Sequence, residues 1–154
     1  MRKMRLFIPL TILFISITNV SFGQNEILGH WLNEEKDAII EISNDGGIFN
    51  GRIVWLEDSL DQFKQPMRDV LNDKSSLRSR TVKGVNMLTG FVYNDGDWKG
   101  GEIYNFESGN DYNGKITLDE AGHLRLKGYY SILFFLGRTK TWTRPAQLEY
   151  YGLR

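Results

Sequence analysis

The sequence predicts an all-β protein, an antiparallel meander of about eight short strands that closes into a barrel. Three observations support this prediction. Clusters of Asn, Asp, Ser and Gly recur between short apolar or alternating segments, which is the pattern of consecutive hairpins. The chain has 16 glycines but only 3 prolines, and no helical pattern of useful length follows residue 24. Finally, an open sheet would leave two unpaired edges, and closure into a barrel removes them.

The expected strands follow one another along the chain, separated by short turns. Residues 29–32 open the first strand and residues 37–43 form the second. The Asn-Asp-Gly-Gly sequence at 44–47 then predicts a tight hairpin turn, because these residues tolerate positive φ. The remaining predicted strands are 48–56, 84–93, 98–106, 111–118, 123–130 and 137–144, the last of which ends before Pro145.

One long connection interrupts this rhythm. Residues 57–81 contain five acidic and five basic side chains and no strand pattern. Long connections inside compact domains are uncommon, and those that occur are often lids or binding loops. We therefore expect either a lid or binding loop here, or a plain solvated connection. Arg78 and Arg80 form a small basic cluster in it, which either binds an anion or pairs with neighbouring acids.

The first residues have the layout of a secretory signal peptide. Three basic residues precede an apolar run at 6–17, and small and polar residues lead to a plausible cleavage point after Gly23. The run is short for a membrane span, which needs about 20 residues; an uncleaved anchor is the alternative. We expect a signal peptide at 1–23 and a single exported domain at 24–154, periplasmic or secreted, with no membrane span after cleavage.

Composition excludes several kinds of chemistry. The chain has 19 basic and 19 acidic residues, which argues against a nucleic-acid partner held by bulk positive charge. It has no cysteine, so disulfides, thiolate catalysis and Cys-ligated metals are excluded. With only two histidines, a His-rich metal site is excluded as well. We expect neither a metal nor a cofactor.

Several short motifs occur along the chain in a characteristic order. They are Gly29-x-Trp31-Leu32, Gly51-Arg52-Ile53-Val54-Trp55-Leu56, Leu77-Arg78-Ser79-Arg80, Leu88-Thr89-Gly90-Phe91, Trp98-x-Gly100-Gly101-x-Ile103-Tyr104-Asn105, Gly109-x-x-Tyr112 and Gly137-Arg138-Thr139-x-Thr141-Trp142-Thr143-Arg144. As a set, these motifs resemble the bacterial exported family called domain of unknown function 2147. The resemblance covers about residues 27–144, and it implies a fold and a compartment rather than an activity.

A second resemblance concerns the barrel itself. Gly29-x-Trp31 on the first strand, with an arginine on the last, is similar to the pattern of lipocalins and other calycins. There the arginine packs over the tryptophan and closes one end of the barrel, in a cation–π contact. The resemblance implies a calycin-like barrel closed by Trp31 with Arg144, or with Arg138. It also implies a ligand cavity, although side chains can fill a small eight-stranded barrel.

A cavity of this kind would need apolar walls and a polar anchor. Both faces of the strand that contains Arg52 are apolar, so alternation does not decide which way this side chain points. Arg52 either points inward and binds an anionic group, or points outward as a surface cation. Glu102 either points inward and pairs with Arg138, or both lie outside. The candidate ligand-binding residues are Arg52, Trp55, Glu102, Tyr104, Tyr112, Arg138 and Trp142.

Three functions follow from these observations. The leading one is non-enzymatic binding of a small apolar or amphiphilic molecule inside the barrel. The alternative is an envelope protein with a filled barrel, which contacts another protein through loop 57–81 or tail 147–154. A carboxylate-based hydrolase is the third. The sequence favours a non-enzymatic protein, because no serine lies in a nucleophile-elbow pattern and no catalytic residue is identified.

Overall fold

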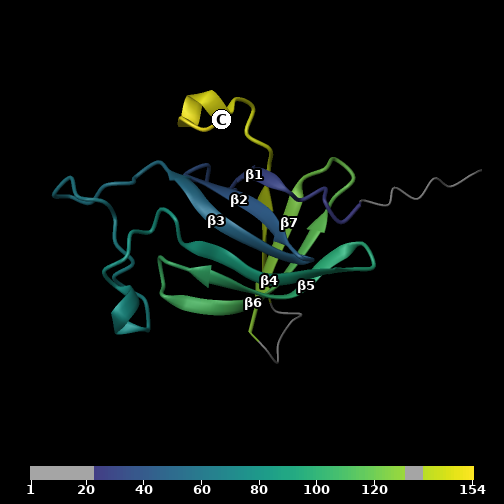
Figure 1. Cartoon of the computed structure of the whole chain (residues 1–154), viewed down its shortest axis with the longest axis horizontal. Coiled ribbons are helices and arrows are strands. Elements are labelled where there is room, and N and C mark those ends of the chain that lie inside the picture. Colours follow the sequence, from purple (N-terminus) through teal and green to yellow (C-terminus); the bar gives the residue numbers. More distant parts are fainter. Residues whose placement is uncertain (1–22, 131–136) are drawn as a thin grey trace, which may run out of the picture.

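The computed structural model describes residues 23–130 and 137–154, which form one eight-stranded antiparallel sheet. The strands lie in the order of the sequence, so each one pairs with the next by a hairpin or a longer connection (Figure 1). The strands are β1 (Gly29–Leu32), β2 (Ala38–Asp45), β3 (Ile48–Leu56), β4 (Asn86–Asn94), β5 (Asp97–Asn105), β6 (Asn110–Leu118), β7 (Leu124–Tyr129) and β8 (Arg138–Trp142).

The sheet curls until its two ends meet. Leu32, at the end of β1, donates a backbone hydrogen bond of 2.8 Å to the carbonyl of Thr143, which follows β8. The amide of Thr143 returns one of 3.0 Å to the carbonyl of Leu32. The result is a nearly closed barrel, and the predicted all-β antiparallel fold is confirmed.

The hairpin between β2 and β3 is tighter than the sequence suggested. The strand continues through Asn44 and Asp45, so the turn itself contains only Gly46 and Gly47, with φ of 60° and 96°. Asn44 still contributes, because its side-chain oxygen accepts a hydrogen bond of 2.8 Å from the amide of Gly47. The positive φ at both turn positions explains why the pair is glycine.

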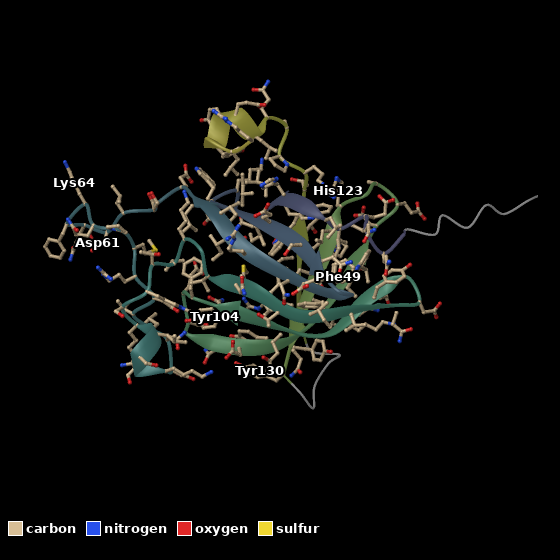
Figure 2. All side chains as sticks on the ribbon, viewed as in Figure 1. Phe49, Asp61, Lys64, Tyr104, His123 and Tyr130 are labelled. Atoms are coloured by element: carbon tan, nitrogen blue, oxygen red, sulfur yellow. The ribbon has the colours of Figure 1, made fainter. Side chains whose placement is uncertain are left out.

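Aromatic side chains fill the interior of the barrel. The ring of Phe91 on β4 lies directly over Gly101 and Gly114, which face each other on β5 and β6. A Cβ atom would lie only 2.3 Å from this ring at Gly101 and 2.4 Å from it at Gly114. The barrel is therefore packed solid at this level. The largest fully buried side chains of the interior include Trp31, Phe49 (Figure 2), Phe91, Trp98 and Leu88.

The C-terminal tail covers part of the outside of the barrel. It ends in a short 3-10 helix, η3 (Leu148–Tyr151), which lies beyond β1 to β3 in Figure 1. The ring of Tyr151 meets that of Trp55 edge-on, with 4.7 Å between centroids. Ile39 pairs with Trp55 across the β2–β3 ladder and is fully buried, although its neighbour Ile40 faces the interior. The tail thus shields an apolar outer face.

The predicted signal peptide falls mainly on residues 1–22, outside the described residues. Within the described part of the chain, none of the helices has the length and apolar character that crossing a bilayer requires.

Candidate functional site

The long connection between β3 and β4 is an ordered loop that projects from one side of the barrel (Figure 1). Isolated backbone bridges join Leu60 to Pro66 and Arg68 to Thr81, and a 3-10 turn, η1, spans Ser75–Leu77. The side chain of Asp61 accepts hydrogen bonds from the amides of Phe63 and Gln65, at 2.8 and 2.9 Å. Asp61 and Lys64 mark the loop tip, far from the sheet in Figure 2.

A buried polar network attaches the base of this loop to β5. The hydroxyl of Tyr104 donates a hydrogen bond of 2.5 Å to the carboxylate of Asp69, which is only 1% exposed. The side-chain amide of Asn72 donates to both Asp69 and Tyr104, each at 2.9 Å. Arg80 completes the network, with guanidinium nitrogens 2.8 and 2.9 Å from the same carboxylate.

The network explains how a carboxylate can be buried here. A buried charge is tolerated when it is paired and its remaining oxygens accept hydrogen bonds, and Asp69 has both. Burial raises the pKa of Tyr104, and the hydrogen bond to Asp69 raises it further, so Tyr104 remains a protonated donor. The guanidinium of Arg80 also lies 5.5 Å from the centroid of the Tyr104 ring.

A second contact holds the loop at the β5–β6 turn. Gly109 has a φ of 74°, and a Cβ atom there would lie 1.9 Å from the carbonyl oxygen of Leu71. Only glycine allows this close approach of two backbones. Loop 57–81 is thus docked on β5 and on the following turn, in a defined position.

This docked loop displays apolar side chains to solvent. Among the described residues, eight large hydrophobic side chains are exposed, and four of them belong to loop 57–81. Phe63 at the tip is 73% exposed and Leu60 is 52% exposed. Val70 and Leu71, near the base, are also more than half exposed. We call these four residues the loop patch.

The three charged candidates lie on the outside of the barrel. Arg52 is exposed on β3 and forms an ion pair of 3.0 Å with Glu41 on β2. Its neighbours Gly51 and Ile53 occupy the inward positions, so alternation along the strand directs Arg52 outward. Glu102 and Arg138 are also exposed. The sequence left open whether each of these side chains points into the barrel or away from it, and in the structure all three are exposed to solvent.

The four aromatic candidates are divided between different environments. Trp142 lies in the interior core, whereas Trp55 lies outside, under the tail. Tyr104 is engaged by the loop, and Tyr112 is half-buried with its ring 5.1 Å from that of Tyr130. The structure therefore does not bring the predicted ligand-binding residues together in one pocket.

Arg144 and Trp31 form the contact that closes the barrel at the start of β1. The guanidinium carbon lies 3.8 Å from the centroid of the indole ring. Its nitrogens donate hydrogen bonds to the backbone carbonyls of Glu26, Leu28 and His30, at 2.7 to 3.2 Å. Burial lowers the pKa of Arg144 from its usual value, an effect that the nearby Glu26 opposes. Arg138, the other candidate, lies at the opposite end of β8, where it pairs with Gly128.

Replacing Arg144 by alanine should lower the free energy of unfolding by about 1–3 kcal/mol, because the cation–π contact and three hydrogen bonds are lost together. Urea denaturation of the mature protein would measure this. Arg138→Ala, an arginine change at the start of the same segment, is the matched control and should change stability by less than about 0.5 kcal/mol. Equal losses in both variants would contradict a closing role for Arg144.

Among the surface hollows formed by described residues, two have linings without any interior aromatic side chain. One, of 440 Å³, lies beside the base of the loop at Arg80–Asn86. The other, of 220 Å³, lies on the outer face of β6, β7 and β8. Neither lining includes a carboxylate, so neither holds the acid pair that a hydrolase of the predicted type needs.

Sequence reasoning missed Asp69 and Asn72, and it considered Arg80 only as part of a basic cluster. These residues lie in a segment of mixed charge, where most acids and bases are solvated. Their partner Tyr104 is 35 residues from Asp69, and no local pattern links the two. Gly109 gave only a weak indication of the loop contact, because the predicted turn between residues 106 and 111 already explains a glycine at this position.

Comparisons with known proteins agree with this architecture. The chain is similar to a solved structure described as protein HP1028 from the human pathogen Helicobacter pylori, which belongs to the lipocalin family. The two share 27% identity with a TM-score of 0.68, over 79% of this chain and 84% of the other. Among curated proteins, none matches. Residues 29–144 match the family described as uncharacterized protein conserved in bacteria. The chain therefore belongs to the bacterial family known as domain of unknown function 2147, and it has a lipocalin-like barrel.

Proposed function

We propose that the protein is an exported, non-enzymatic binding protein that recognises another protein of the cell envelope through the loop patch. The single observation that carries this proposal is the exposure of Leu60, Phe63, Val70 and Leu71 on one loop, whose base is docked by buried contacts. Exposed apolar side chains that gather on one element commonly mark an interaction site. Because the base of the loop is held in position, less conformational entropy is lost at Val70 and Leu71 when a partner binds.

The charges beside the patch favour a protein partner. Asp58 and Asp61 lie next to Leu60 and Phe63 at the tip, together with the basic Lys64. An anionic membrane surface would repel the two carboxylates. A protein surface with an apolar pocket for Phe63 and charges of both signs around it fits this arrangement. The close packing of Phe91 on Gly101 and Gly114 inside the barrel also favours recognition outside it.

Removing the two apolar side chains at the tip should weaken this association. A photo-activatable amino acid at position 63 would identify the partner in cells, with position 48 as the comparison. Binding of the purified pair would then be measured by calorimetry. Leu60→Ser with Phe63→Ser should weaken binding at least about tenfold, because each buried side chain contributes about 1.5–3 kcal/mol.

The matched control removes two exposed apolar side chains outside the loop. Ile48 and Val92 face each other on β3 and β4, and both are exposed. Ile48→Thr with Val92→Thr keeps β-branched residues in the strands and should leave the dissociation constant within about twofold. A partner whose affinity falls equally in both double variants does not use the loop patch, and the proposal would be wrong.

A small apolar ligand in the barrel is the second candidate, because the Helicobacter pylori protein with this fold is described as a lipocalin. Native mass spectrometry of protein purified from its own envelope separates the two candidates. A retained small molecule that quenches the fluorescence of the interior tryptophans would favour the second. Bare protein after incubation with a lipid extract would favour the loop patch. The denatured mass of the same sample reports whether the chain begins at Gln24, after the proposed cleavage.

A further inference from the structure

The outer face of β5, β6 and β7 carries lysines directly opposite one another. Lys99 pairs with Lys115 across the β5–β6 ladder, and Lys115 pairs with Lys127 across the β6–β7 ladder. Adjacent strands are only about 4.8 Å apart, so three ammonium groups are held on neighbouring strands of one face. Like charges directly opposite each other in a sheet reduce stability. This row is therefore unfavourable for the fold by itself.

Neighbouring carboxylates offset only part of this charge. Asp97 forms ion pairs with Lys115 at 2.8 Å and with Lys99 at 3.2 Å. Glu102 lies in the next row of the same face and is exposed. Arg125 adds a fourth cation one row away, and Asp111 adds a third carboxylate further along β6, so four cations meet three carboxylates. The face has a net charge of +1, whereas the whole chain has a formal net charge of zero.

The cations surround a depression. The hollow of 220 Å³ on this face is lined by Lys115, Thr117, Arg125, Lys127 and Thr139. Its lining contains two ammonium groups, one guanidinium and two hydroxyls, and the ammonium group of Lys115 is also paired with Asp97 at the edge of the hollow. Arg125 is held in place because it donates a hydrogen bond of 2.6 Å to the hydroxyl of Thr141 on β8.

We propose that this hollow binds a phosphoryl group, either on a lipid headgroup or on a soluble phosphate compound. A phosphoryl dianion concentrates charge on several oxygens, and it can accept hydrogen bonds from both lysines, the arginine and a threonine at once. A single carboxylate would neutralise only one of these cations. The volume suits one phosphoryl group with part of the group attached to it. None of these residues belongs to the loop patch, so the proposal does not depend on the proposed function.

The test compares two double variants that remove the same charge. Lys115→Gln with Lys127→Gln alters the hollow. Lys74→Gln with Lys83→Gln alters the segment between β3 and β4, outside the hollow of 220 Å³. Calorimetry with inorganic pyrophosphate tests the soluble source. Sedimentation with phosphatidylcholine vesicles, with and without phosphatidic acid, tests the lipid source. Wild-type protein should bind at least one of these probes, and the first double variant should bind it at least tenfold more weakly, with the second within twofold.

The results with the two probes identify the source of the phosphoryl group or overturn the proposal. Binding to pyrophosphate alone assigns a soluble ligand, and binding to phosphatidic acid vesicles assigns a headgroup. Binding to neither probe, or equal losses in the two double variants, overturns the proposal. The thermal midpoint provides a separate readout, because removing opposed lysines should leave it unchanged or raise it. A clear fall in the midpoint for Lys115→Gln with Lys127→Gln would assign these lysines a structural role and would also overturn the proposal.

Discussion

Replacing Phe91 by alanine should destabilise the barrel by about 3–5 kcal/mol, the range measured for large-to-alanine changes in closely packed cores. The phenyl ring is fully buried and lies against two glycines that have no side chains of their own. Removing it would leave the backbones of Gly101 and Gly114 facing an empty space. Urea denaturation of the mature protein, followed by circular dichroism, would measure the loss.

Phe63→Ala is the matched control, because it removes the same side chain from an exposed position. It should change stability by less than about 0.5 kcal/mol. A double-mutant cycle tests the specific contact: Gly101→Ala alone should cost about 1–3 kcal/mol by overpacking. Combined with Phe91→Ala, it should cost much less than the sum of the two single changes. Additive losses would contradict the packing of the ring on the glycine.

Replacing Asp69 by alanine should destabilise the protein by about 3 kcal/mol, at the lower end of what a broken buried ion pair costs, because Arg80 is partly exposed. Arg80, Asn72 and Tyr104 would all lose their shared acceptor. Loop 57–81 would then keep its backbone contact with Gly109 and the packing of Met67 against the core. Thermal denaturation would measure the stability, and limited trypsin digestion at Lys64 or Arg68 would report release of the loop.

Asp58→Ala is the control for this change, since Asp58 is an exposed acid of the same loop. It should alter neither the thermal midpoint nor the rate of cleavage. Tyr104→Phe removes only the hydroxyl and should cost about 1–2 kcal/mol. If Asp69→Ala left the loop as resistant to trypsin as in the wild-type protein, the network would not be what anchors it.

The fold could be predicted because its determinants are local. Each hairpin is specified by a turn cluster and by alternation in the flanking segments, and both can be read from a few residues. The remaining errors were small: β2 runs two residues further than expected, because Asn44 and Asp45 still pair with β3. The contact of Trp31 with Arg144 was anticipated by resemblance, whereas nothing local in the sequence links these two distant positions.

The candidate ligand site was not predictable in the same way. On β3 both faces are apolar, so periodicity could not decide whether Arg52 or Ile53 points inward. The structure gives the reason: on the outer face the ring of Trp55 packs against Tyr151 of the tail, so this face is apolar as well. The network around Asp69 joins segments that are distant in the sequence, and its members have the composition of an ordinary solvated loop.

The simple order of the strands determines how the chain can fold. From β1 to β8 every ladder joins sequence neighbours, so most of the sheet can form by zippering of successive hairpins, with little entropy lost in loop closure. The bridge between Leu32 and Thr143 is different, since it joins the two ends of the meander. We expect this contact between the two ends of the sheet to form last and to open first, with Arg144 stabilising its closed form. Opening it would expose the unpaired edges of β1 and β8, which a second molecule could join in a swapped dimer.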